Sequence, residues 1–216
     1  MPRRYIMFLI GLTFNAFGVA FITKASLGTS PIAAIPYSLS LIVPSLSLGN
    51  WVVIFNILLV LIQLILLKRD ANKIELLMQV GIAFVFGYCI DLSLLCIRSF
   101  SPATYAAKLM SLLAGCVIIA MGAYLQVTAD VVMLPGDAFV RAIARIARRQ
   151  YGGVRVICDI SMSVIAAALC LIFLRELLGV REGTIITAFL VGNIIKLFTK
   201  LLLPLKNRLL PEKTDG

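Results

Sequence analysis

Ionisable side chains lie inside long apolar segments of this sequence, where a charged group is costly unless a partner or water compensates it. Asp91 lies in FGYCIDLSLLCI, Asp159 follows VIC, and Lys196 lies in the last apolar segment. Side chains in such places form buried ion pairs or face a polar cavity that binds a solute. The chemistry that they favour is the binding of a small molecule within a membrane, and a carboxylate there can also carry a proton.

Two breaks interrupt the apolar pattern, one in each half of the chain. The first contains G-T-S-P at 28–31, and the second contains P-G-D at 135–137. Each break starts a shorter helical pattern, and the free N–H groups at such a helix start commonly contribute to solute sites in membrane proteins. Together with the polar residues of the apolar segments, the breaks supply these candidate binding residues: Asn15, Ser30, Asn56, Asp91, Asp137, Arg141, Asp159 and Lys196.

Most of these candidates also have a purely structural interpretation. Asp137 precedes Arg141 by four residues, and Arg155 precedes Asp159 by four. Opposite charges at this spacing neutralise each other on one helix. Asp137 can also cap the helix that begins at the second break.

The remaining charges have structural alternatives as well. Asp91 and Lys196 can form a buried ion pair, or Lys196 can extend towards the membrane surface. The arginines that follow the second break repeat at about one helical turn, which is typical of a face against anionic lipid headgroups. They are Arg141, Arg145, Arg148 and Arg149.

Enzymatic chemistry has little support. The chain contains no histidine, no G-x-S-x-G, no H-E-x-x-H and no Walker-type glycine loop, and these are the patterns that would indicate common catalytic sites. Its five cysteines all lie in apolar segments without a C-x-x-C pair. We therefore expect a protein that is not an enzyme and that has no cofactor, no metal ion and no disulfide.

The composition is that of an integral membrane protein. Hydrophobic residues make up 61% of the 216 residues, charged residues make up 14%, and the mean hydropathy is +1.04. This leaves too little polar sequence to cover a water-soluble globule. The net charge of +10 comes from short Lys and Arg clusters between apolar segments, as the positive-inside rule describes. We expect a lipid bilayer around the chain and no nucleic-acid partner.

Apolar segments of about 20 residues, the length that crosses roughly 30 Å of hydrocarbon, recur along the chain. They predict spans at 5–23, 50–67, 74–97, up to 128, 153–174 and 183–203. Shorter helices are expected after Pro31, with Ser30 as its N-cap, and after Pro135. The predicted fold class is all-α, a polytopic helical membrane protein with a single domain over 1–216.

The two halves, about 5–99 and 106–205, resemble each other. At a constant offset Gly18 falls on Gly122 and Pro31 on Pro135, and one skipped residue later brings Asn56 onto Asp159. Later in the chain, at a different offset, Gly87 matches Gly192 and Asp91 falls on Lys196. We therefore predict two pseudo-symmetric repeats.

Two topologies remain open. Four spans in each half would place the copies parallel, whereas three spans plus a partial helix would invert the second copy. With three spans, Lys68, Arg69, Lys73 and the four arginines of the second break all face the cytoplasm, as the positive-inside rule requires. Arg141 and Arg145 also avoid the bilayer centre, where each would cost about 2.5 to 3.5 kcal/mol. We favour this version, and both versions place both termini in the cytoplasm.

Three motifs resemble the YczE/YyaS/YitT group of bacterial integral membrane proteins. They are G-x-A-x4-A-x-L-G-x-S-P at 18–31, L-G-N-W at 48–51 with Asn56, and P-G-D-A-F at 135–139 with the later Cys158-Asp159. The resemblance covers most of the chain. It implies a membrane transport protein of the shorter type, without the soluble C-terminal domain of YitT-like relatives, and it carries over no established binding residue.

The leading hypothesis is a transporter in the bacterial inner (cytoplasmic) membrane, with an unknown small-molecule substrate bound near midplane between the repeats. The alternative is an accessory membrane protein or a substrate-capture subunit that acts with a partner complex. A homo-oligomer is compatible with either hypothesis.

Overall fold

The computed structural model describes residues 2–68 and 72–202, and over these ranges every regular element is an α-helix. Arg69, on which part of the charge argument rests, and the tail after residue 202 lie outside the described residues. The helices of the described ranges are α1 (Pro2–Ala25), α2 (Pro31–Ile42), α3 (Leu48–Leu67), α4 (Lys73–Cys96), α5 (Tyr105–Ala129), α6 (Pro135–Ala147), α7 (Tyr151–Phe173) and α8 (Glu182–Leu201). The all-α prediction is confirmed.

Helix length divides these elements into two classes. α1, α3, α4, α5, α7 and α8 are long and apolar enough to cross a membrane. α2 has 12 residues and α6 has 13, so at about 1.5 Å per residue each is much shorter than the hydrocarbon layer. These lengths favour three spans plus a partial helix in each half over four spans in each half.

Proline starts both short helices, as the two breaks predict. Pro31 follows an extended Ser30, and Pro135 follows Leu134 in a similar backbone conformation. Proline fits the first helical position because it has no N–H to satisfy and its φ is already helical. Ser30 occupies the N-cap position, but its side chain forms no capping hydrogen bond. Helix α2 continues through Pro36 to Ile42.

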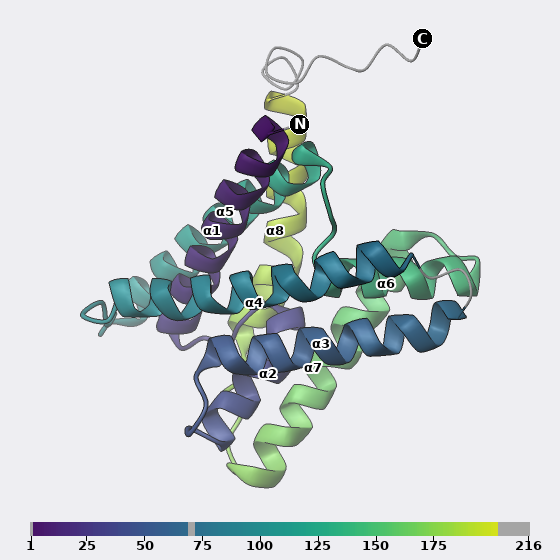
Figure 1. Cartoon of the computed structure of the whole chain (residues 1–216). Helices are drawn as coiled ribbons and strands as arrows, with labels where there is room; N and C mark the ends of the chain where they lie inside the picture. The colour runs from purple at the N-terminus through teal and green to yellow at the C-terminus, as the bar shows by residue number, and fades with distance from the viewer. Residues whose placement is uncertain (1, 69–71, 203–216) are drawn as a thin grey trace.

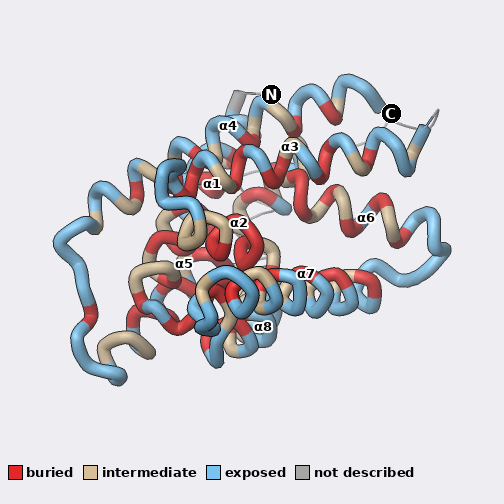
Figure 2. The backbone as a smooth tube through the Cα atoms, turned by 90° about the horizontal axis from the view of Figure 1, so that it is seen from below, coloured by how far each residue is buried: buried red, intermediate tan, exposed pale blue. Residues whose placement is uncertain are grey.

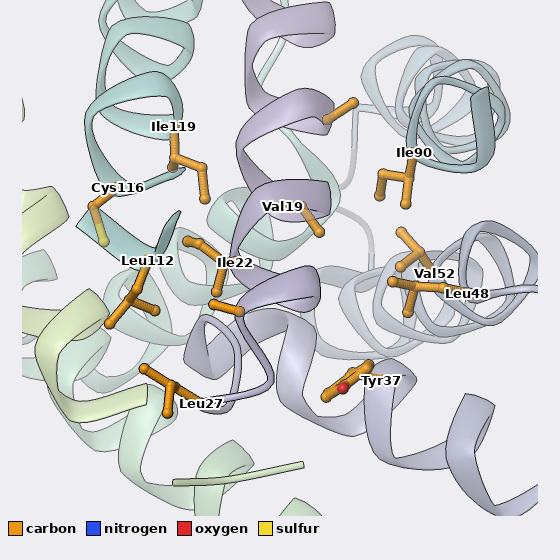
Figure 3. Close-up of a cluster of buried hydrophobic side chains, with 12 residues drawn as sticks. Val19, Ile22, Leu27, Tyr37, Leu48, Val52, Ile90, Leu112, Cys116 and Ile119 are labelled. Carbon is orange, nitrogen blue, oxygen red and sulfur yellow. The ribbon is translucent and has the colours of Figure 1, made fainter. Parts of the chain in front are cut away.

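The most extensive contact between two helices is that of α1 with α5, which lie side by side in Figure 1 and contribute buried side chains to the cluster in Figure 3. Gly18 of α1 faces Gly115 of α5, and a Cβ atom on Gly18 would lie 2.9 Å from the Gly115 carbonyl oxygen. Gly11 and Gly122 face each other about two helical turns further along this antiparallel pair. Small residues at such positions allow two helix backbones to approach closely. Buried side chains such as Ile22 and Leu112 fill the space beside this contact.

Helix α4 packs on α1 and helix α8 packs on α5, and α2, α3, α6 and α7 extend the bundle from there. The helix pairs that pack together include α3 with α4, α1 with α4, α5 with α8, α2 with α7 and α3 with α6. Figure 1 shows α3 and α4 side by side, running across the steeper α1 and α8. Figure 2 shows buried positions where helices face one another and exposed positions on the outer sides of α7 and α8.

Large apolar side chains cover the outer faces of the long helices. Leu77, Tyr88 and Phe189 are each more than 70% exposed, and all three lie on candidate spans. An exposed apolar surface of this extent is unfavourable in water and is expected where lipid covers it. The chain is a multi-pass membrane protein.

Candidate functional site

A cavity of about 610 Å³ lies among the helices, and every one of the eight contributes to its lining. This volume falls within the range of small-molecule sites. The lining includes six of the eight candidate residues from the sequence: Asn15, Ser30, Asn56, Asp137, Arg141 and Asp159. Asp91 and Lys196 do not line it.

Both predicted breaks reach the cavity. Ser30 and Pro31 line it from the start of α2, and Gly136 and Asp137 line it from the start of α6. Because the first N–H groups of a helix have no partner within the helix, each start offers donors and a partial positive charge. The cavity is therefore the place where the two irregular stretches of the chain meet.

Two glutamines fix the start of α6 against α3 and α4. The Gln63 amide nitrogen donates to Gln79 Oε1 and to the Pro135 carbonyl oxygen, both at 3.2 Å. Both glutamine side chains are almost fully buried. Buried polar groups that satisfy one another in this way hold a unique geometry. The position of Asp137, two residues after Pro135, depends on this contact.

An ion cluster joins α6 and α7 at the cavity wall. The Arg155 guanidinium donates to Asp137 through Nη1 and to Asp159 through Nε, the latter at 3.2 Å. The Tyr151 hydroxyl lies 3.2 Å from the same Nη1. Arg155 thus bridges two carboxylates from different helices, and it connects a broken stretch to a long span.

One carboxylate oxygen of this cluster has no partner. Asp159 Oδ1 is buried and accepts no hydrogen bond from any described residue. Most buried polar atoms in proteins are satisfied, so an unsatisfied one calls for an explanation such as a bound molecule. This oxygen belongs to a residue that lines the cavity.

The structural alternative in which Asp137 pairs with Arg141 is wrong. Arg141 lies 3.9 Å from Glu75 of α4, its Nη1 approaches the Met133 sulfur at 3.0 Å, and Asp137 pairs with Arg155. Asp137 and Arg141 do lie one turn apart on α6, but Arg155 of the neighbouring helix α7 binds Asp137 instead. Asp137 also does not cap α6, since the N-cap position belongs to Leu134 and no side-chain capping bond forms there.

Asp91 and Lys196 have other surroundings. Asp91 accepts hydrogen bonds from the Ser47 hydroxyl at 2.5 Å and from the Gly49 N–H at 2.8 Å. It therefore ties α4 to the start of α3, where a negative charge is favourable. Lys196 is exposed on α8 and forms no ion pair with Asp91 within the described residues. The buried pair between them is not present.

Arg155 is central to the site, although the sequence did not place it among the candidates. It was expected to neutralise Asp159 on its own helix, and that contact is present. Its second contact, to Asp137, joins residues 18 positions apart across a turn between two helices. To predict this contact from the sequence, one would have had to know that α6 packs beside α7.

Metal-ligand clusters are absent from the residues that the structure describes, where no group of three His, Cys, Asp or Glu side chains could hold an ion. All five cysteines, which lie within those residues, are free thiols. The expectation that the protein needs no metal or cofactor stays a prediction.

Comparison with known proteins relates the chain to proteins of unknown function. One curated relative, "Uncharacterized protein YyaS" of Bacillus subtilis (strain 168), is 25% identical over 199 residues, covering 90% of this chain and 92% of the relative. No solved structure matches. A family described as "Family of unknown function (DUF6198)" matches residues 2–200. The match to nearly the whole chain and the YyaS relative agree with the resemblance in the motifs, and the chain belongs to this family of unknown function.

Proposed function

We propose that the chain is a transporter of a small solute in the bacterial cytoplasmic membrane and that the solute binds in the cavity between its two halves. The cavity carries this proposal, because it collects both helix breaks and an ion cluster inside a bundle of candidate spans. Discontinuous helices whose ends face a central polar site are characteristic of secondary transporters.

The pattern of helix packing supports a duplicated bundle as part of this proposal. Exchanging α1 with α5, α2 with α6, α3 with α7 and α4 with α8 converts the α1–α4 contact into α5–α8. The same exchange converts α2–α7 into α3–α6, while α1 and α5 exchange with each other. If the halves are repeats of this kind, rocking one against the other would open the cavity to each side in turn.

Transport assays on the purified chain in lipid vesicles test the proposal. Solutes are first selected by their effect on the thermal stability of the protein, since a ligand of the folded state stabilises it. Uptake should be lost in Asn56→Ala and Asp159→Ala, while insertion into the membrane is retained. Unchanged uptake in both variants would overturn the proposal.

The proposed orientation needs a separate measurement. In a cysteine-free background, single cysteines at positions 73 and 98 are labelled with a membrane-impermeant thiol reagent. Three spans plus a partial helix in each half predict that position 73 reacts from the cytoplasm and position 98 from outside. Labelling of position 73 only from outside would contradict the three-span version.

An accessory or substrate-capture role is the second candidate, and the surface of α6 favours it. Arg141 and Arg145 are exposed on this helix, whereas Val140 and Ala144 are buried. A cationic face on a short helix suits an acidic partner protein or anionic lipid. Loss of a co-purifying protein in Arg145→Ala and Arg148→Ala, with transport-linked growth unchanged, would favour this role over transport.

A further inference from the structure

Charge in the cavity wall is unevenly distributed, and this bears on the class of solute. Asp137 and Asp159 share Arg155, so the cluster of these three carries one net negative charge. The other arginine in the lining, Arg141, has a side chain that is 61% exposed and lies 3.9 Å from Glu75. Because Glu75 lies outside the lining, the Arg141 charge is compensated from beyond the cavity.

The geometry of the cluster shows where a positive group would bind. Asp159 Oδ2 accepts from Arg155 Nε at 3.2 Å, whereas Asp159 Oδ1 accepts nothing. Arg155 also donates to Asp137 and lies beside the Tyr151 hydroxyl, so its donors already have partners on two sides. Two carboxylates therefore share one guanidinium at the cavity wall, and a hydrogen bond between an ammonium group and a carboxylate is among the stronger kinds.

Away from this cluster the wall is largely apolar. Phe55, Phe86 and Ile90 line it from α3 and α4, and Ile119 and Val191 line it from α5 and α8. Apolar walls favour a solute with a hydrocarbon or aromatic body, and phenylalanine rings also attract cations. The wall therefore suits a molecule with one polar end.

We propose that the cavity binds an organic cation with an apolar body, whose ammonium group lies against the Asp137–Arg155–Asp159 cluster and compensates its net negative charge. The inference rests on the proposed function for its site, and it specifies the class of solute. A neutral molecule of the same shape lacks the positive charge, and an anionic one is repelled by the net negative charge of the cluster, so both bind more weakly.

Three probes of matched shape test the inference: 2-phenylethylammonium, 2-phenylethanol and 3-phenylpropionate. Each is titrated into the purified full-length chain in detergent while thermal unfolding is followed. The ammonium compound should raise the unfolding temperature in a saturable manner, and the alcohol and the carboxylate should not. An equal rise with either of these, or no rise with the ammonium compound, would overturn the inference.

Two variants assign the effect to the cavity. Asp159→Asn should weaken the apparent affinity for 2-phenylethylammonium by about tenfold or more. Asp91→Asn, which changes a carboxylate outside the cavity, should leave that affinity unchanged. If the Asp159 variant does not fold, the comparison of the three probes on the unchanged protein decides.

Vesicle assays separate this inference from the proposed function. Binding of 2-phenylethylammonium without uptake above the leak of protein-free vesicles would keep the inference and overturn transport, leaving a capture role. Uptake of a neutral or anionic solute that depends on Asn56, without binding of the ammonium compound, would keep transport and overturn the inference.

Discussion

The contact between α3 and α4 differs sharply from the arrangement of α7 and α8, although the predicted repeat makes these pairs equivalent. Gly49 and Gly87 face each other so closely that a Cβ atom on Gly87 would lie 2.6 Å from the Gly49 carbonyl oxygen. At the matching positions, Cβ atoms on Gly152 and Gly192 would meet no atom within 4 Å. The helix pair is closely packed in the first half only, and Figure 1 shows α7 and α8 diverging from the segment that joins them.

Burial follows the same division. Within the most apolar 18 residues of each span, 39% are buried in α3 but 22% in α7, and 28% in α4 but 11% in α8. The ion cluster lies on the loosely packed side, because Arg155 and Asp159 belong to α7. Their counterparts in the first half are the neutral Val52 and Asn56. The first half thus provides a closely packed wall for the cavity, and the second half provides a more loosely packed wall that carries the ion cluster.

The largest effect is expected from a methyl group added at the close contact. In Gly49→Ala the new Cβ would press on the Gly87 carbonyl oxygen and lie 2.6 Å from the Asp91 carboxylate carbon. Since neither backbone can move without parting the helices, the free energy of unfolding should fall by about 2 to 3 kcal/mol. Thermal unfolding in detergent measures it.

Gly152→Ala is the matched control for that variant, because it adds the same methyl group in open space at the equivalent position. Its free energy of unfolding should stay within about 0.5 kcal/mol of the unchanged protein. Equal losses in the two variants would show that the two helix pairs do not differ in packing.

A smaller effect is expected when the ion cluster is broken. Arg155→Ala leaves two partly buried carboxylates without their shared partner. The free energy of unfolding should fall by about 2 kcal/mol, less than for a fully buried pair because all three side chains keep some exposure. Adding Asp137→Asn and Asp159→Asn to the same chain should recover most of the loss. A triple variant no more stable than Arg155→Ala would show that packing of the arginine stem, and not charge, is what was lost.

The contacts of Asp91 at the start of α3 should contribute less to the free energy of unfolding than the ion cluster does. Asp91→Asn weakens the hydrogen bonds from Ser47 and Gly49 at the start of α3, so a loss of about 1 kcal/mol is expected in thermal unfolding. Lys196→Ala alters the position that matches Asp91 in the predicted repeat. It should change stability by less than about 0.5 kcal/mol, since Lys196 is exposed. A larger loss in the lysine variant would contradict the difference between the halves.

Hydropathy and proline positions were enough to predict the helices, because membrane spans and helix starts depend on local sequence. The expected spans 50–67 and 74–97 differ from α3 and α4 by at most two residues at each end. Contacts between helices could not be predicted in this way, because they join residues that lie far apart in the sequence. Spacing along one helix paired Asp137 with Arg141, whereas packing of α6 on α7 brought Arg155 to it. Asp91 resembled a charge in the middle of a span, but it lies near the end of α4, where it binds the start of α3.

Gly192→Ala tests whether the loosely packed side moves. The new methyl group meets no atom in this structure, and alanine favours a helix interior over glycine, so the folded protein should gain about 0.5 kcal/mol or stay unchanged in thermal unfolding. Gly192 lines the cavity, however, and its counterpart Gly87 shows how closely this position can approach a neighbouring helix.

If α7 and α8 pack against each other at another stage of the proposed transport cycle, as α3 and α4 do here, the added methyl group would obstruct that stage. Solute uptake into vesicles by Gly192→Ala should then be slower, although the variant is at least as stable as the unchanged protein. Uptake at the original rate would mean that α7 and α8 never come as close as α3 and α4. The difference in helix packing between the two halves would then persist throughout transport.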